Sequence, residues 1–381
     1  MIDRRSFLAS AAGVLATPIL AGAGSQPAGP SLSSLAADKG IMFGTALSFD
    51  QARPRPKTPD ADRYRALVLA QCGALVCENE MKWQAVRPNE ATFDFERADA
   101  IVALAGEHGM RMRGHTLLWH HPDWFPHWLT EYDFGPRPAV KAEQVLQTHI
   151  RRVCSRYPQV VSWDVVNEAI DADTGERRET SLSRAMGPSV LDVAFHTARE
   201  ASPSAQLVYN DYMSWEAGHE QHRSGVLRLL EGFKARGVPI DALGVQSHIG
   251  SGNADDSVGF DTAQETEWRR FLDEVTGMGL KLAVTEFDVH DKNLPADPVI
   301  RDREVAALGR RYLDLMLEYP QTSTVMTWGM NDRQSWLQGR WPRADGLAKR
   351  PTPYDANLRA KQLRDAMAAA FVAAAPRTPL V

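Results

Sequence analysis

The sequence contains few of the residues that would indicate a disulfide scaffold, a metal centre or a nucleic-acid surface. Only three cysteines occur in 381 residues, an odd number without metal-ligand spacing, so we expect no required disulfide and no bound metal. A formal net charge of −5 provides no basic surface for nucleic acid, and it is compatible with a neutral substrate. With 44% hydrophobic and 24% charged residues, the composition is typical of an ordinary soluble globular protein.

The beginning of the chain has no charged side chain between Arg5 and Asp38. The adjacent Arg4 and Arg5 stand ahead of a modestly apolar stretch rich in Ala and Gly, which resembles a twin-arginine export signal. Pro18 and the many small residues make this stretch a poor membrane span. We therefore expect residues 1–23 to be a signal peptide, and the protein to be exported to the periplasm or beyond without stable membrane association.

Strand-like and helix-like runs alternate after a segment rich in Gly, Pro and Ser at 24–34, which we expect to be a flexible linker. Eight strands, each followed by an amphipathic helix, predict an α/β protein with a single (β/α)8 TIM barrel over residues 35–381. The expected strands are 42–46, 74–77, 110–118, 160–166, 206–210, 242–246, 281–285 and 324–328, and the expected helices are 60–71, 96–108, 139–156, 189–200, 219–236, 262–278, 302–318 and 354–370.

Capping residues mark several of the expected helix ends. Asp60 can cap the start of the first helix, because its side chain can accept from a free backbone N–H. Gly109, Gly237 and Gly279 follow three helices at the place where a left-handed residue commonly ends them.

Two of the strand-like runs end in a glutamate where the strand would pass into a loop. Glu168 follows the run Trp163-Asp164-Val165-Val166-Asn167, and Glu286 follows Leu282-Ala283-Val284-Thr285. In a barrel these positions are the C-terminal ends of the fourth and seventh strands, where barrel enzymes keep their catalytic groups. A retaining glycosidase needs two such carboxyl groups, about 5 to 5.5 Å apart, because one protonates the leaving oxygen while the other attacks the sugar carbon.

Segments rich in polar and aromatic residues accompany the expected strands in order. They are Glu78-Asn79-Glu80-Met81-Lys82-Trp83, Arg113-Gly114-His115-Thr116-Leu117-Leu118-Trp119-His120, Trp163-Asp164-Val165-Val166-Asn167-Glu168-Ala169, Asn210-Asp211-Tyr212, Gln246-Ser247-His248, Thr285-Glu286-Phe287-Asp288, and Trp328-Gly329 with Asp332, Ser335 and Trp336. Together they resemble glycoside hydrolase family 10, the endo-1,4-β-xylanases, over residues 36–370. An ordered set of this kind is much more specific than any one of its segments.

The resemblance implies a retaining endo-1,4-β-xylanase in which Glu168 is the general acid/base and Glu286 the nucleophile. It implies no cofactor. His248, held by Asp288, would keep Glu286 ionised and oriented. Asn167 would bind the sugar 2-hydroxyl, where a hydrogen bond that tightens in the transition state lowers the barrier.

The resemblance also implies a cleft that binds xylan or xylo-oligosaccharide, in a protein that we expect to be a monomer. Polar side chains would satisfy sugar hydroxyls while indole faces pack on pyranose rings. The residues implied are Glu78, Asn79 and Lys82 for the sugar two positions before the cut, His115, Trp119, Gln246, Trp328 and Trp336 for the sugar at the cut, and Tyr212 for the leaving side.

Two positions depart from the family pattern, His121 ahead of Pro122 and Met213 after Tyr212, and both concern the leaving side. Two tryptophans in expected loops, Trp215 and Trp341, are candidates to extend the cleft. Trp268 lies in a helical run, so we expect it to pack in the core.

Other functions compatible with these residues are another retaining β-glycanase of the cellulase or mannanase type, and a non-catalytic polysaccharide-binding barrel. The second is disfavoured because neither acid nor its supporting residues are missing. A metal-dependent hydrolase is also disfavoured, because no strand carries a His-x-His pair.

Replacing Arg4 and Arg5 by lysine should leave the protein in the cytoplasm, because twin-arginine export depends on that pair. Fractionation of cells that express the wild type and the double variant measures this. An unchanged periplasmic yield would exclude the twin-arginine route.

Overall fold

Parallel strands form a closed barrel at the centre of the computed structural model, which describes residues 29–53, 59–250 and 262–380. The strands pair in the order β6-β5-β4-β3-β2-β1-β9-β8, and β6 pairs again with β8, which closes the ring. The short β7 follows β6 and also pairs with β8. The predicted (β/α)8 barrel is therefore confirmed. The strands are β1 Met42–Leu47, β2 Ala74–Cys77, β3 Arg111–Trp119, β4 Val160–Asn167, β5 Gln206–Asp211, β6 Ala242–Val245, β7 His248–Ile249, β8 Lys281–Val289 and β9 Thr322–Thr327.

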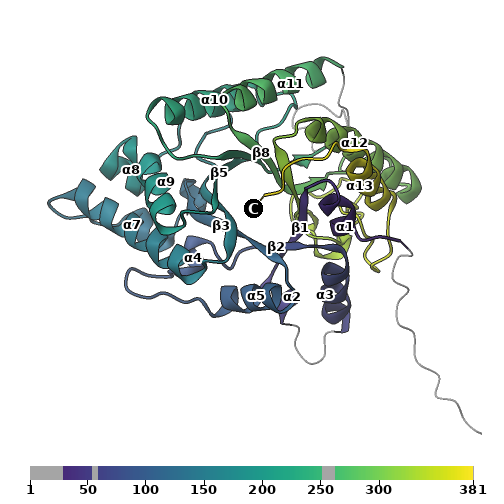
Figure 1. Ribbon diagram of the computed structural model, residues 1–381, viewed down its shortest axis with the longest axis horizontal. Helices are drawn as coiled ribbons and strands as arrows, with labels where there is room; N and C mark the ends of the chain where they lie inside the picture. The colour runs from purple at the N-terminus through teal and green to yellow at the C-terminus, as the bar shows by residue number, and fades with distance from the viewer. Residues whose placement is uncertain (1–28, 54–58, 251–261, 381) are drawn as a thin grey trace, which may run out of the picture. The chain divides into compact units, whose positions relative to one another are not determined.

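Helices surround the strands on all sides, as Figure 1 shows in a view along the barrel. The longer ones follow the strands in turn, while the shorter ones lie in the connecting loops. Within the described residues, no helix combines the length and the apolar character needed to cross a membrane. The helices are α1 Leu32–Ala37, α2 Phe49–Ala52, α3 Pro59–Gln71, α4 Trp83–Val86, α5 Glu96–Glu107, α6 His127–Thr130, α7 Pro138–Arg156, α8 Ser181–Met186, α9 Ser189–Ala201, α10 Glu220–Ala235, α11 Thr262–Gly277, α12 Pro298–Glu318 and α13 Gln362–Ala373, with short 3₁₀ turns η1 Pro122–Trp124, η2 Asp332–Gln334 and η3 Trp336–Gly339.

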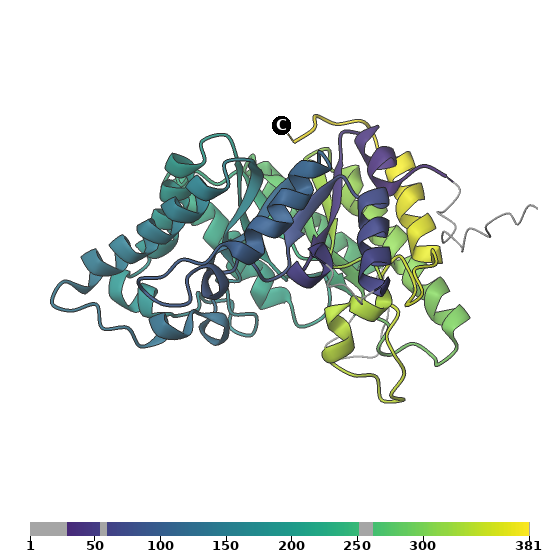
Figure 2. The same ribbon diagram turned by 90° about the horizontal axis from the view of Figure 1, so that it is seen from below.

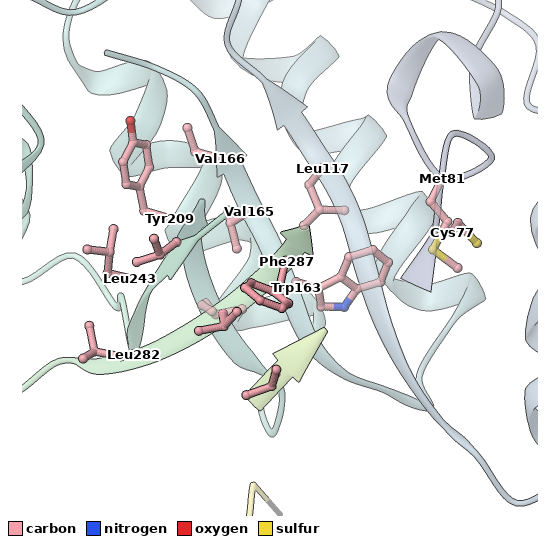
Figure 3. Close-up of a cluster of buried hydrophobic side chains, with 14 of the residues drawn as sticks. Cys77, Met81, Leu117, Trp163, Val165, Val166, Tyr209, Leu243, Leu282 and Phe287 are labelled. Carbon is pink, nitrogen blue, oxygen red and sulfur yellow. The ribbon is translucent and has the colours of Figure 1, made fainter. Parts of the chain in front are cut away.

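Buried side chains from the strands fill the space inside the barrel and between the strands and the helices. Figure 3 shows Trp163 of β4 near Leu117 of β3 and Phe287 of β8, and all three are buried. Gly114 of β3 has no side chain where the Trp163 indole lies, since a Cβ there would be only 2.0 Å from Cε3 of that ring. The glycine of the Arg-Gly-His segment is thus needed for packing.

The two ends of the barrel differ. The C-terminal tail covers the end where the strands begin, because Arg111, the first residue of β3, donates to the Leu380 carbonyl and the Arg377 N–H donates to Lys39 O at 3.0 Å. Figure 2 shows this tail at one end and the yellow-green segment that contains η2 and η3 at the other. The end where the strands finish is therefore left to the connecting loops.

Several predicted boundaries are wrong. The expected linker 24–34 runs into α1, because Ser31 caps that helix by accepting from Ser34 N at 3.0 Å, and Leu32 is fully buried. The predicted signal peptide at 1–23 lies outside the described residues. Asp60 is not an N-cap, since α3 begins one residue earlier, at Pro59.

The last helix begins at residue 362, eight residues later than the predicted start at 354. The Asp355 carboxylate accepts from the backbone N–H groups of Asn357 and Arg359 at 2.8 and 2.9 Å, which forms a turn that competes with helix. Leu358 adopts a left-handed φ of 65°. Residues 354–361 therefore form a turn.

The helix ends at three glycines agree with the structure, and one strand is longer than predicted. The expected helix-terminating glycines at 109, 237 and 279 have φ values of 63°, 69° and 79°. All three cysteines are free and buried. Strand β8 continues to residue 289, beyond the predicted end at 285, so that Asp288 belongs to a strand that is fixed on both sides.

Gly114→Ala should lower the free energy of unfolding by roughly 1–3 kcal/mol or more, because overpacking forces Trp163 and the strand apart. Thermal or denaturant unfolding measures the loss. The matched control is Gly106→Ala in α5, where an added Cβ meets no atom within 4 Å and the change should be neutral or stabilising by up to about 1 kcal/mol. Equal stability of the two variants would contradict this account of the barrel core.

Candidate active site

A cleft of about 610 Å³ opens at the end of the barrel where the strands finish. It collects side chains from the ends of several strands and from the loops that follow, as expected for a barrel enzyme. Of the residues predicted from the sequence, the cleft is lined by Glu78, Asn79, Lys82, His115, Trp119, Asn167, Glu168, Tyr212, Gln246, His248, Glu286, Trp328 and Trp336. Asp288 does not line the cleft and stands behind His248.

Glu286, in β8, is a nearly buried carboxylate with a partner on each oxygen. Its Oε1 accepts from Asn210 Nδ2 at 2.9 Å, and its Oε2 lies 3.3 Å from His248 Nε2. Burial alone would raise its pKa, but the hydrogen bond from His248, the charge of His115 and the amide of Asn210 hold the pKa at about 2. Glu286 is therefore ionised at neutral pH.

His248 is held between two carboxylates. Its Nδ1 lies 2.9 Å from Asp288 Oδ1, while Nε2 faces Glu286. Burial acts to lower the pKa of His248, but the charges and hydrogen bonds of Asp288 and Glu286 raise it to about 10. Trp336 Nε1 donates to the other oxygen of Asp288 at 2.8 Å. The predicted support of Glu286 by His248 and Asp288 thus has the expected geometry.

Glu168 follows β4 and has a left-handed φ of 54°, which turns its side chain into the cleft. Trp119 Nε1 donates to Oε2 at 2.9 Å, and Gln246 Nε2 donates to Oε1 at 2.7 Å. Burial raises the pKa of Glu168, the charge of Asp211 raises it further, and the two hydrogen bonds lower it in part. Glu286 also raises the pKa of Glu168, but less than Asp211 does.

The two carboxyl groups therefore have opposite tendencies in one cleft. Glu286 is stabilised as an anion, while the surroundings of Glu168 favour the protonated form. Such a pair can supply a nucleophile and a general acid at the same pH. This is the arrangement required for displacement at a sugar carbon with protonation of the leaving oxygen.

Asn210, near the end of β5, holds the side chains of Glu286 and Asn167. Its Oδ1 accepts from the Thr285 hydroxyl at 2.7 Å, which directs its Nδ2 to Glu286 and to Asn167 Oδ1, each at 2.9 Å. The Nδ2 group of Asn167 is then buried without a protein partner among the described residues. A buried donor without a protein partner, in a residue that lines the cleft, is suited to bind a sugar hydroxyl. The sequence analysis named Asn210 only within the segment Asn210-Asp211-Tyr212 and predicted no role for it.

A group of polar residues after β2 lies at one side of the cleft. Lys82 Nζ donates to Asn79 Oδ1 at 2.8 Å and stands 4.7 Å from the centre of the Trp119 ring. Burial lowers the pKa of Lys82, while Glu286, Glu168 and Glu78 act in the opposite direction. The Asn79 carboxamide and the Lys82 ammonium are thus presented together at the mouth.

His115 and Trp328 line the cleft and contact each other. The His115 Nδ1 lies 3.0 Å from Asp164 Oδ2, and its ring meets Trp328 edge to face at 5.4 Å. Tyr212 also lines the cleft, and its hydroxyl accepts from Arg178 at 2.9 Å. The structure thus brings together the residues that the family resemblance implied for the sugar at the cut, the sugar two positions before it and the leaving side.

Aromatic residues that had no assigned role complete the rim. Trp124, which is 41% exposed, stacks on Trp119 with ring centres 5.4 Å apart, and the Arg340 guanidinium lies 5.4 Å from the Trp124 ring. Trp341 lines the cleft, as proposed from the sequence, but Trp215 does not. Only 2% of Trp215 is exposed.

Trp215 packs instead against Trp268 and Tyr312, with ring centres 6.2 and 5.1 Å away. Its expected role in the cleft is therefore wrong, because the loop that follows β5 folds inward at this residue. Trp268 is fully buried, as predicted.

The similarity to known proteins extends over almost the whole described chain. Residues 31–370 match the family model described as Glycosyl hydrolase family 10. Endo-1,4-beta-xylanase B of Thermotoga neapolitana is 31% identical over 284 residues, which cover 74% of this chain and 76% of that protein. Endo-1,4-beta-xylanase A of Thermoanaerobacterium saccharolyticum is 32% identical over 316 residues, or 79% of this chain, but this chain spans only 25% of its length.

A solved structure shows the same architecture. The crystal structure of xylanase 10B from Thermotoga petrophila in complex with xylobiose superposes with a TM-score of 0.79. The sequences are 28% identical, and the match covers 91% of this chain and 98% of that one.

His248→Gln should raise the pKa of Glu286 by about 1 unit or more, because it removes the cation next to the carboxylate. Carboxyl titration followed by NMR on protein with 13C-labelled glutamate measures the shift. The control is His196→Gln, which changes an exposed histidine of α9 away from the cleft. A Glu286 carboxyl that titrates identically in both variants would exclude His248 as the source of its low pKa.

Proposed function

Because this chain belongs to glycosyl hydrolase family 10, we propose that it is an endo-1,4-β-xylanase that hydrolyses internal bonds of xylan with retention of configuration. The observation that carries the proposal is the pair of glutamates in one cleft with opposite electrostatic surroundings. In this assignment Glu168 is the general acid/base and Glu286 is the nucleophile.

In the first step, Glu286 attacks the anomeric carbon while Glu168 gives its proton to the leaving glycosidic oxygen. The bond from carbon to the leaving oxygen breaks as the bond to Glu286 forms, so the intermediate is a glycosyl ester. Asn167 Nδ2 donates to the sugar 2-hydroxyl, and this hydrogen bond strengthens as positive charge develops on the ring.

In the second step, Glu168 is an anion and removes a proton from water, which attacks the anomeric carbon from the leaving-group side. Glu286 departs as a carboxylate. The contact with His248 stabilises that departing charge, because the imidazolium remains beside Oε2 throughout. Two inversions at the same carbon give net retention.

Substrate recognition is proposed to use polar and aromatic side chains that line the cleft. Asn79, Lys82 and Glu78 are suited to hydroxyl groups of the sugar chain before the cut, and Trp328 and Trp336 to the faces of the ring at the cut. Tyr212 is suited to the leaving side. The xylanase names of two relatives and the xylobiose in the similar crystal structure support xylan as the polymer.

Another retaining β-glycanase, acting on cellulose or mannan, is the alternative within the same chemistry. Reducing-sugar release from xylan, cellulose and mannan under equal conditions distinguishes these substrates. Highest activity on cellulose or mannan would replace xylan in the proposal and leave the roles of the glutamates unchanged.

Glu168→Ala and Glu286→Ala should differ in the substrates that they can still use. Without Glu286 no glycosyl ester forms, so hydrolysis should fall by several orders of magnitude for every glycoside. Without Glu168, xylan hydrolysis should fall similarly, while an aryl xylobioside with a good leaving group should still form the ester and then stall. Burst kinetics with that aryl substrate measure the difference.

Added azide tests the same assignment through its product. In Glu168→Ala azide attacks the glycosyl ester and should give a β-glycosyl azide, and in Glu286→Ala it attacks the substrate directly and should give the α-anomer. The assignment would be overturned if Glu168→Ala gave the α-azide, or if it lost aryl substrates and xylan equally.

A further inference from the structure

A further carboxylate, Asp211, is buried at the end of β5, the strand next to the one that Glu168 follows. Asp211 is fully buried, and it accepts from the Tyr209 hydroxyl on Oδ2 and from the Tyr212 backbone N–H on Oδ1 at 2.9 Å. It lies close to Glu168, because the Glu168 N–H donates to the carbonyl of the preceding residue, Asn210, at 2.9 Å.

His222 of α10 stands on the other side of Asp211. It is fully buried, and its Nε2 lies 3.0 Å from Asp211 Oδ1. This contact is within ion-pair distance, but neither ring nitrogen of His222 makes an aligned hydrogen bond to the described residues. The ring also meets Tyr212 edge to face at 4.7 Å. The contact is therefore a close approach of the two side chains and not an aligned hydrogen bond.

Burying a carboxylate is costly unless other groups compensate its charge. If Asp211 only stabilised the fold, an apolar or amide side chain could take its place at lower cost. The negative charge of Asp211 raises the pKa of Glu168 more than that of Glu286 does. The position of this charge near the acid is the observation that calls for an explanation.

We propose that Asp211 and His222 are positioning residues that act through charge on Glu168: Asp211 favours its protonated form, and His222 limits that effect. This inference rests on the proposed role of Glu168 as the general acid. The elements that surround the pair contribute further charged or titratable groups. They are Glu286, Lys82 and Tyr212 around Glu168, and Tyr209, Tyr212, His219 and His121 around Asp211 and His222.

The direction of each effect follows from electrostatics. A negative charge near Glu168 disfavours its ionised form, so the acid keeps its proton to higher pH. In this proposal His222 carries a proton, and its positive charge partly cancels that of Asp211. Removing Asp211 and removing His222 should therefore move the titration of Glu168 in opposite directions, whereas loss of structure alone would not produce opposite shifts.

The experiment is the pH dependence of kcat/KM on xylo-oligosaccharide, whose alkaline limb reports the loss of the Glu168 proton in the free enzyme. Asp211→Asn should move this limb to lower pH by about 1 unit, and His222→Gln should move it to higher pH. In the Asp211→Asn background, His222→Gln should add little, because the charge that it offsets is gone.

Two control variants separate charge from packing. His222→Lys keeps a cation beside Asp211 and should leave the limb at its wild-type position or below it. His149→Gln removes another fully buried histidine, which stacks on Trp83 at 3.8 Å, and should leave the limb unchanged.

Shifts of the same sign in Asp211→Asn and His222→Gln, or no shift in either variant once it is shown to be folded by circular dichroism, would overturn the inference. If Asp211→Asn does not fold, the comparison of His222→Gln with His222→Lys decides, and equal limbs in those two contradict the role of charge. Glu168→Gln tests the proposed function separately. An alkaline limb that persists in Glu168→Gln would mean that Glu168 is not the acid.

Discussion

The contact between His248 and Glu286 determines which of the two carboxyl groups at the mouth of the barrel carries charge. Burial by itself would favour the neutral form of both glutamates. His248, made cationic by Asp288 on its far side, reverses that preference for Glu286 alone. The opposite electrostatic tendencies of the two glutamates are therefore due mainly to this imidazole and the carboxylate that holds it, with further contributions from His115 and Asn210.

The barrel makes this contact possible through its strand register. β8 runs on to residue 289, so Glu286 and Asp288 lie on one face of the same strand, because side chains two apart point the same way. The strand is interrupted after β6, where Ser247 adopts a left-handed φ of 66°. Pairing with β8 then resumes in β7, with His248 opposite Asp288. This local irregularity places the His248 imidazole within reach of the Glu286 and Asp288 carboxylates. Asn210 of β5 connects the same group to Asn167, next to Glu168.

Hydrophobic patterning in the sequence predicted the barrel and its approximate strands. The ordered segments around Glu168 and Glu286 predicted the cleft residues. The sequence could not predict the turn at 354–361, where the Asp355 side chain competes with helix. The burial of Trp215 was also missed, since nothing local distinguishes an indole that faces the core from one that faces the cleft. The Trp124 and Arg340 contact joins loops distant in sequence. The influence of Asp211 on Glu168 likewise depends on a neighbouring strand.

Covalent trapping tests the central claim most directly, namely that Glu286 is the ionised nucleophile and Glu168 is not. A 2-deoxy-2-fluoro xylobioside with a good leaving group slows both steps but lets the ester form and accumulate. After proteolysis, mass spectrometry of the inactivated protein should find the fluorosugar on the peptide that contains Glu286, and nowhere else. A label on Glu168, or inactivation without any covalent label, would contradict the account.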